Sequence, residues 1–128
     1  MTEIQNSKQN QAWPKQYDLE ERTYLFAKRV REFVRKLPKT ISNIEDGSQV
    51  IRSSGSQAAN YIEANESLSK KDFFMRIKIS RKESKESKLW LRLVFTNDNE
   101  TLEKERVGLI QEATELMNIF GSILKKNV

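Results

Sequence analysis

The segment from Lys78 to Leu93 contains neither glycine nor proline and is rich in strong helix formers with alternating charges. This composition predicts one long, uninterrupted helix. Ser69, followed three residues later by Asp72, resembles a capping box, so we expect the helix to begin there. The stripe expected to face the core is apolar at both ends and serine-rich in the middle: Phe73, Ile77, Ser80, Ser84, Ser87, Leu91 and Val94.

Three further runs repeat apolar residues at helical spacing. The first run covers residues 19–37 and stops before a proline. The second covers residues 44–66, after a link at residues 39–43. The last is expected to begin at a capping signal formed by Asn97 with Glu100. The expected core positions are Leu19, Thr23, Phe26, Val30, Phe33 and Leu37, then Ile44, Ser48, Ile51, Gly55, Ala58 and Ile62, then Leu102, Leu109, Ala113, Leu116, Phe120 and Ile123.

Helices joined by short links run antiparallel to their neighbours, so the fold class predicted is all-α, an up-down-up-down four-helix bundle. A chain of 128 residues is the size of one domain. We expect a polar, flexible N-terminal tail over residues 1–16 and a single bundle domain over residues 17–128. The chain has no cysteine, so no disulfide framework is expected. No apolar run approaches the length that a bilayer requires, and no secretory leader is apparent, so we expect a cytoplasmic protein without membrane contact.

The middle of the second helix is made of small residues, with Ser53, Ser54, Gly55 and Ser56 at the level of the serines of the third. Two interpretations stay open. The helices pack tightly there, with hydroxyl groups bonded to carbonyls one turn back, or they enclose a cavity for a small ligand. We expect Gly55 to allow the close approach of a neighbouring helix.

Two segments resemble a known family: Ile51-Arg-Ser-Ser-Gly-Ser-Gln-Ala-Ala-Asn-Tyr-Ile-Glu-Ala64 and Ile79-Ser-Arg-Lys-Glu-Ser-Lys-Glu-Ser-Lys-Leu-Trp-Leu91. They are similar to the bacterial four-helix-bundle proteins encoded in intervening sequences of ribosomal RNA genes, over roughly residues 18 to 126. The resemblance implies a ring-shaped homopentamer and a relationship to the accessory protein of diversity-generating retroelements, which acts through a basic surface. The positions that match the family signature are Arg52, Ser56, Asn60, Glu63, Glu83 and Glu86.

Charge is distributed unevenly along the chain. Residues 22–39 carry seven Lys or Arg against one acid, and residues 70–92 carry nine against three, within a total net charge of +5. The first and third helices are therefore basic, and on the third the cations recur at spacings of three and four residues, which places them on one face. The residues that we predict to contact nucleic acid are Arg29, Arg35, Lys78, Arg81, Lys82, Lys85, Lys88 and Arg92.

A basic helix face has two interpretations. It can follow a phosphate backbone, or it can be solvated and neutralised inside the bundle by pairs such as Arg52 with Glu86. Five copies in a ring would repeat the face and make weak phosphate contacts multivalent. Such a ring also needs apolar surface outside the core, for which Phe74, Trp90, Leu93 and Phe95 are candidates. The alternative is that some of these residues belong to a broad core face.

The chain lacks histidine, cysteine and a glycine-rich phosphate loop, so we predict no enzymatic activity, no catalytic residue, no metal site and no cofactor. The predicted function is binding of RNA or of an RNA-protein partner by a homo-oligomeric bundle. The alternative is a protein-interaction adaptor that does not contact nucleic acid, and a third class is a bundle that holds a small molecule.

Overall fold

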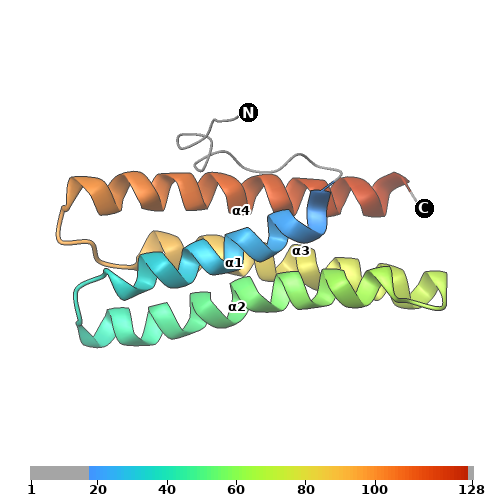
Figure 1. Cartoon of the computed structure of the whole chain (residues 1–128), viewed down its shortest axis with the longest axis horizontal. Helices are drawn as coiled ribbons and strands as arrows, with labels where there is room; N and C mark the ends of the chain where they lie inside the picture. Colours follow the sequence, from blue (N-terminus) through green and yellow to red (C-terminus); the bar gives the residue numbers. More distant parts are fainter. Residues whose placement is uncertain (1–17, 127–128) are drawn as a thin grey trace, which may run out of the picture.

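The computed structural model describes residues 18–126, so the predicted tail and Tyr17, Asn127 and Val128 lie outside the described residues. Within this range the chain forms four helices and no strand: α1 (Leu19–Arg35), α2 (Ile41–Asn65), α3 (Lys70–Leu93) and α4 (Glu100–Lys126). Consecutive helices run antiparallel (Figure 1). The predicted four-helix bundle is confirmed.

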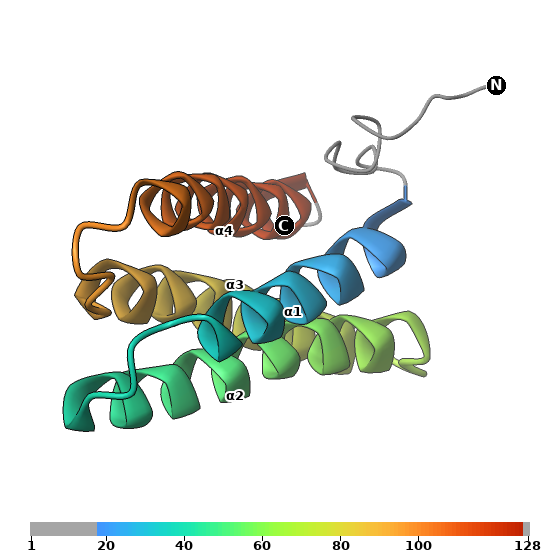
Figure 2. The same ribbon diagram turned by 60° about the vertical axis from the view of Figure 1, so that its left-hand side comes forward.

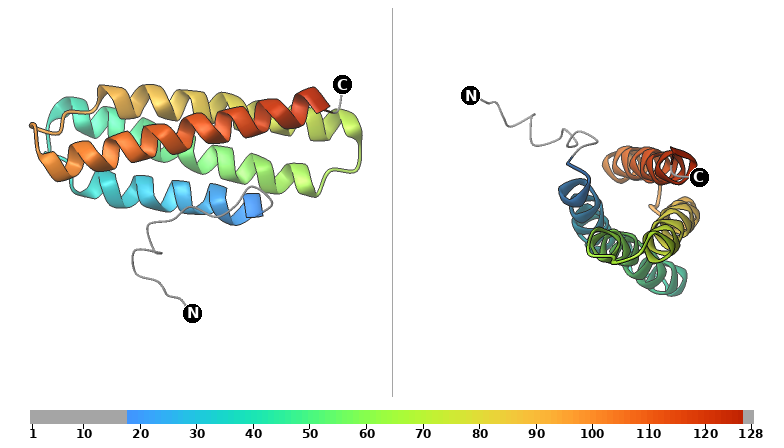
Figure 3. Two further views of the ribbon diagram at one scale, coloured as in Figure 1. Left: turned by 90° about the horizontal axis from the view of Figure 1, so that it is seen from above. Right: turned by 90° about the vertical axis from the view of Figure 1, so that its right-hand side faces the viewer.

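The four helices do not pack equally. The pairs α2 with α3 and α3 with α4 share the most extensive contacts, while α1 packs mainly on α2 and less extensively on α4. Figure 2 shows α1 lying along α2, and the end-on view in Figure 3 shows α2 between α1 and α3, with α4 on the other side of α3. Helix α3 therefore has a neighbour on each side, α2 and α4, and only its outer face is open to solvent.

The predicted core stripes of α1, α3 and α4 are confirmed with few exceptions. All six expected positions of the first helix are buried, and so are all but Phe73 in α3 and all but Ile123 in α4, and these two are half-buried. The largest fully buried side chains are Phe26, Phe33 and Phe120. Helical periodicity was sufficient for these helices because most of their large apolar side chains, and the serines of α3, repeat at helical spacing on the buried face.

The predicted core stripe of α2 was right at Ala58, which is buried, and in part at Ile51, which is half-buried against the core, but the other expected positions lie about one residue away from the buried face. Ile44 is 60% exposed and Ile62 is 45% exposed, whereas Gln57 is completely buried. The face that packs inward carries small and polar residues. A Cβ atom at Gly47 would lie 2.9 Å from Val34 Cγ1, and one at Gly55 would lie 3.1 Å from Arg31 Nη2, so both glycines allow the close approach of α1. The buried residues of α2 are Asn43, Gly47, Val50, Ser53, Ser54, Gln57, Ala58 and Ala64.

Two predicted helix ends were also wrong. Helix α2 begins at Ile41, because the Thr40 hydroxyl accepts a hydrogen bond from the Asn43 amide at 3.1 Å and so caps the helix earlier than the apolar pattern indicated. Helix α4 is capped by Asn99, whose Oδ1 accepts from the Leu102 amide at 2.9 Å. Asn97 instead adopts a left-handed conformation, with φ at 58°.

Asn43 joins two links at one end of the bundle. Its Nδ2 donates to the carbonyl oxygens of Pro38 at 2.9 Å and Phe95 at 2.7 Å, and its Oδ1 accepts from the Phe95 amide at 2.8 Å. A single amide side chain thus bonds the α1–α2 link to the α3–α4 link. This arrangement fixes the point at which α3 ends and the chain turns toward α4.

A buried ion pair connects α1 to α4. Arg22 donates from Nε to Glu112 Oε2 at 2.7 Å and from Nη2 to Glu112 Oε1 at 2.9 Å, and a further bond from Nη2 reaches Glu115 Oε1 at 2.6 Å. Glu112 is only 1% exposed. Burial raises the pKa of Glu112, and the hydrogen bonds and charge of Arg22 oppose this rise. The pKa of the Glu115 carboxyl is lowered, chiefly by the hydrogen bond from Gln111 and also by Arg22, although partial burial acts in the opposite direction.

Removing Arg22 tests this pair. We expect Arg22→Met to destabilise the fold by about 3–5 kcal/mol near pH 7, because it leaves a buried carboxylate without its cation. The pKa of Glu112 in the folded chain lies above its ordinary value of 4.5, so the deficit should shrink as the pH falls toward that value and Glu112 becomes neutral. Urea unfolding at a series of pH values measures this dependence.

The double variant Arg22→Met/Glu112→Leu is the matched control. It removes both charges, so it should recover most of the stability at pH 7 and lose the extra pH dependence. A deficit in Arg22→Met that stays constant from pH 7 to acid would contradict the assignment of the buried charge to Glu112.

Candidate nucleic-acid interface

The rotation of α3 about its own axis is set by polar contacts with α2. The hydroxyl groups of Ser53 and Ser87 lie 2.7 Å apart, and Ser80 Oγ donates to the Gln57 carbonyl oxygen at 2.9 Å. Ser84 Oγ donates to the Ser80 carbonyl oxygen, one turn back, at 2.9 Å. These serines are completely buried, so the serine stripe is an interhelical packing face. The tight-packing interpretation of the bundle centre is confirmed.

With the serine face turned inward, a row of cations lies on the outer side of α3 next to α4. We call the residues Lys78, Arg81, Lys85, Lys88 and Arg92 the α3 ridge; their spacings are three, four, three and four residues. Steps of this size advance about 4.5 or 6 Å along a helix, so neighbouring charges lie close to one another on one face. Lys88 is half-buried and the others are exposed.

The charges of the α3 ridge are not neutralised locally. Some cations elsewhere in the bundle do have carboxylate partners: Arg22 with Glu112, Lys36 with Glu105, and Arg106 with Glu103. No residue of the α3 ridge forms an ion pair with an acid among residues 18–126. Neutralisation inside the bundle therefore does not account for this face, although it does account for other basic residues.

At Arg81, helix α4 borders the α3 ridge with a glycine. The Arg81 side chain passes over Gly121, where a Cβ atom would lie 3.6 Å from Arg81 Nε. The neighbour of this part of the ridge is therefore a neutral residue and not an acid.

The other predicted contact residues lie elsewhere or beside the ridge. Lys82 is exposed on α3, further around the helix from α4 than Arg81. Arg29 and Arg35 lie on α1, across the bundle from α3, and the charge of Arg29 acts on Glu112 of α4. The two predicted basic faces are therefore separate surfaces of one subunit.

The family-signature positions line the junction of α2 and α3. Arg52 lies 3.9 Å from a carboxylate oxygen of Glu83 and 3.9 Å from one of Glu86, so the predicted pairing of Arg52 with Glu86 is confirmed. Asn60 Nδ2 donates to the Ser56 carbonyl oxygen at 3.0 Å.

The same junction contains Arg76, which the sequence analysis did not single out, and a carboxylate oxygen of Glu83 that has no hydrogen-bond partner in the described chain. Arg76 Nη1 donates to Asn60 Oδ1 at 3.0 Å, which ties the two helices together. Glu83 is buried, and its Oε1 has no hydrogen-bond partner in the described chain. Glu63 is exposed nearby on α2. These residues join helices and do not contribute to the α3 ridge.

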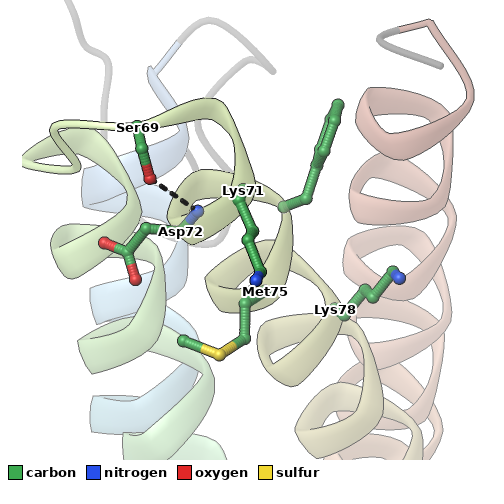
Figure 4. A pocket seen from close by; sticks show the side chains of 6 residues that line it. Ser69, Lys71, Asp72, Met75 and Lys78 are labelled. Carbon is green, nitrogen blue, oxygen red and sulfur yellow. Dashed lines mark hydrogen bonds between the residues drawn. The ribbon is translucent and has the colours of Figure 1, made fainter.

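A surface hollow of about 480 Å³ lies at the beginning of α3. Its lining residues are Ser69, Lys71, Asp72, Phe74, Met75 and Lys78. Figure 4 shows Lys71, Met75 and Lys78 projecting from α3, and the hydrogen bond from the Asp72 amide to Ser69 Oγ, which measures 3.1 Å, at the start of the helix. The hollow is separate from the serine-rich centre of the bundle but shares Lys78 with the α3 ridge.

Residues 18–126 hold no group of three or more acidic or other metal-ligating side chains suited to a metal ion. None of the helices in that range combines the length and the apolar character that a bilayer crossing requires.

The four antiparallel helices define the class of this protein as a four-helix bundle. The chain belongs to the 23S rRNA-intervening sequence protein family, whose model matches residues 10–122. It is also similar to a solved structure from Bacteroides thetaiotaomicron, described as a protein of unknown function from the S23 ribosomal protein family. The TM-score is 0.71 at 24% identity, covering 84% of this chain and 98% of that one, which shows a shared fold. No curated protein matches the sequence.

Proposed function

We propose that this protein is a non-enzymatic, cytoplasmic RNA-binding bundle that contacts RNA, or an RNA-protein partner, through its basic faces on α3 and α1. One observation carries the proposal: Arg81, Lys85, Lys88 and Arg92 form a row of charges without carboxylate partners in the described chain. A regular row of cations is the arrangement that follows a phosphate backbone. The family's connection with 23S rRNA agrees with RNA as the ligand.

The composition agrees with a binding role. The chain has no histidine and no cysteine, so the common general bases and thiolate nucleophiles are missing. The buried acids take part in contacts between helices: Glu112 is bonded to Arg22, and Glu83 pairs with Arg52.

We also propose that the bundle assembles as a homo-oligomeric ring. The support is the apolar surface of α2 that the single subunit leaves uncovered, where Ile41 is 84%, Ile44 60% and Ile62 45% exposed. Burying such residues against a second copy would remove apolar area from water, and repetition of the α3 ridge around a ring would make phosphate contacts multivalent.

The second candidate function is a protein-interaction adaptor that does not bind nucleic acid. It is favoured by exposed apolar residues at the end of α3, where Leu93 is 54% and Phe95 49% exposed. Exposed apolar groups that lie together mark protein contact sites. An adaptor would keep its partner after nuclease treatment and after removal of the α3 ridge charges.

The charge-removal variant Arg81→Gln/Lys85→Gln/Lys88→Gln/Arg92→Gln tests the RNA proposal. We expect weaker RNA binding and a plot of log affinity against log salt that is less steep by about 3, because four phosphate contacts to a single strand are lost. Fluorescence anisotropy between about 50 and 200 mM salt measures both quantities.

The matched control removes the same number of charges at exposed positions outside the ridge: Lys39, Lys104, Lys125 and Lys126, each changed to Gln. This variant should retain most of the affinity and nearly the full salt slope. Equal losses in both variants would mean that overall charge, and not the α3 ridge, attracts the RNA. Unchanged affinity in the ridge variant would remove the ridge from the mechanism.

The ring proposal is tested by light scattering coupled to size-exclusion chromatography. The wild type should elute as a particle several times the 15.0 kDa chain mass, and Ile44→Glu/Ile62→Glu should reduce it toward one chain, because charges at a buried contact are costly. Val107→Glu on α4, where Val107 is 65% exposed, is the control and should leave the mass unchanged. A monomeric wild type would contradict the ring.

A further inference from the structure

We infer that the hollow at the beginning of α3 binds an unstacked base of single-stranded RNA whose phosphates follow the α3 ridge. This inference rests on the proposed RNA-binding function and adds the class of nucleic acid and a site for the base. The hollow and the α3 ridge share Lys78 and adjoin each other on the outer side of α3.

The continuity follows from helical spacing. Lys71, Phe74 and Lys78 are separated by three and four residues, which continues the three-and-four spacing of the ridge toward the beginning of α3. The full row from Lys71 to Arg92 therefore extends about 32 Å along the helix. A strand held by the cations would reach the hollow at the row's N-terminal end.

The lining of the hollow suits a flat, polarisable group. Phe74 is half-buried, and its ring centroid lies 6.0 Å from that of Phe73, with the rings inclined by 58°. The Lys70 ammonium nitrogen lies 5.8 Å from the centroid of Phe74, within the range of a cation–π contact. Met75, 48% exposed, adds a polarisable thioether to the lining. The ring is thus positioned before any ligand arrives.

The polar groups around the hollow favour a base over a phosphate. Asp72 contributes a carboxylate, which repels a phosphate group but can accept a hydrogen bond from the exocyclic amine of a base. Lys71 and Lys78 provide donors at the edges of the hollow and can hold the phosphates on either side. A volume of about 480 Å³ lies within the range of small-molecule sites.

A single strand is the form of RNA that can contact both the cations of the α3 ridge and the aromatic ring of Phe74. In a duplex the base faces are covered by their neighbours in the stack, and A-form grooves present phosphates and 2′-hydroxyl groups to the protein. In a single strand the bases are free to stack on aromatic side chains while cations track the backbone. A duplex could contact the ridge but could not place a base beside Phe74.

The experiment compares a labelled single-stranded RNA of about 12 nucleotides with the duplex of the same sequence, by fluorescence anisotropy on the full chain. Phe74→Leu keeps apolar bulk and removes the aromatic face, so single-strand affinity should fall about 5- to 100-fold with an unchanged salt slope, and duplex affinity should not change. Phe74→Tyr keeps the aromatic face and should bind like the wild type.

The control variant is Phe95→Leu, which removes an exposed aromatic ring beyond the other end of α3 and should change neither affinity. Wild-type single-strand affinity in Phe74→Leu, or equal affinity of the wild type for the two RNAs, would overturn the inference while the ridge still binds RNA. Absence of binding to both RNAs by the wild type would overturn the proposed function and this inference together.

Discussion

The packing of α3 against α2 through hydroxyl groups is the contact on which the rest of the molecule depends. Apolar side chains alone permit small rotations of one helix against another, but a pair such as Ser53 with Ser87, or the bond from Ser80 to the Gln57 carbonyl, is satisfied in one setting only. Once the serines are turned inward, the geometry of the helix places the α3 ridge outward. The position of the basic face is therefore a consequence of buried polar packing.

A second set of polar groups completes the bundle. Asn43 joins the two links at one end, and the pair of Arg22 with Glu112 attaches α1 to α4 where apolar contact is least extensive. A buried pair of this kind contributes modest net stability, but loss of one member is costly. Its effect is to restrict the arrangement of α1, while the cations of α3 remain without such partners and are available for a ligand.

The sequence predicted most of this fold because apolar residues repeat at helical spacing in α1 and α4, and because serines continue the apolar spacing through the middle of α3. It failed for α2, where the inward face is made of small and polar residues and Ile44 and Ile62 lie outside. Hydrophobic periodicity cannot distinguish a core stripe from an uncovered apolar surface. The cation row of α3 was predicted from spacing, and the same spacing extended toward the beginning of α3 would have placed Lys71 and Phe74 on the same face. The pairing of Arg22 with Glu112 could not be predicted, since the two residues are 90 positions apart.

The central claim is that RNA lies along one face of α3, and ultraviolet cross-linking followed by peptide mass spectrometry tests it most directly. Cross-linked nucleotides on wild-type protein should map to the peptides spanning Lys70 to Arg92, with the N-terminal part of α3 that contains Phe74 among them. Cross-links confined to α1 or to the junction of α2 and α3, or none above those of an unrelated acidic protein, would contradict the account.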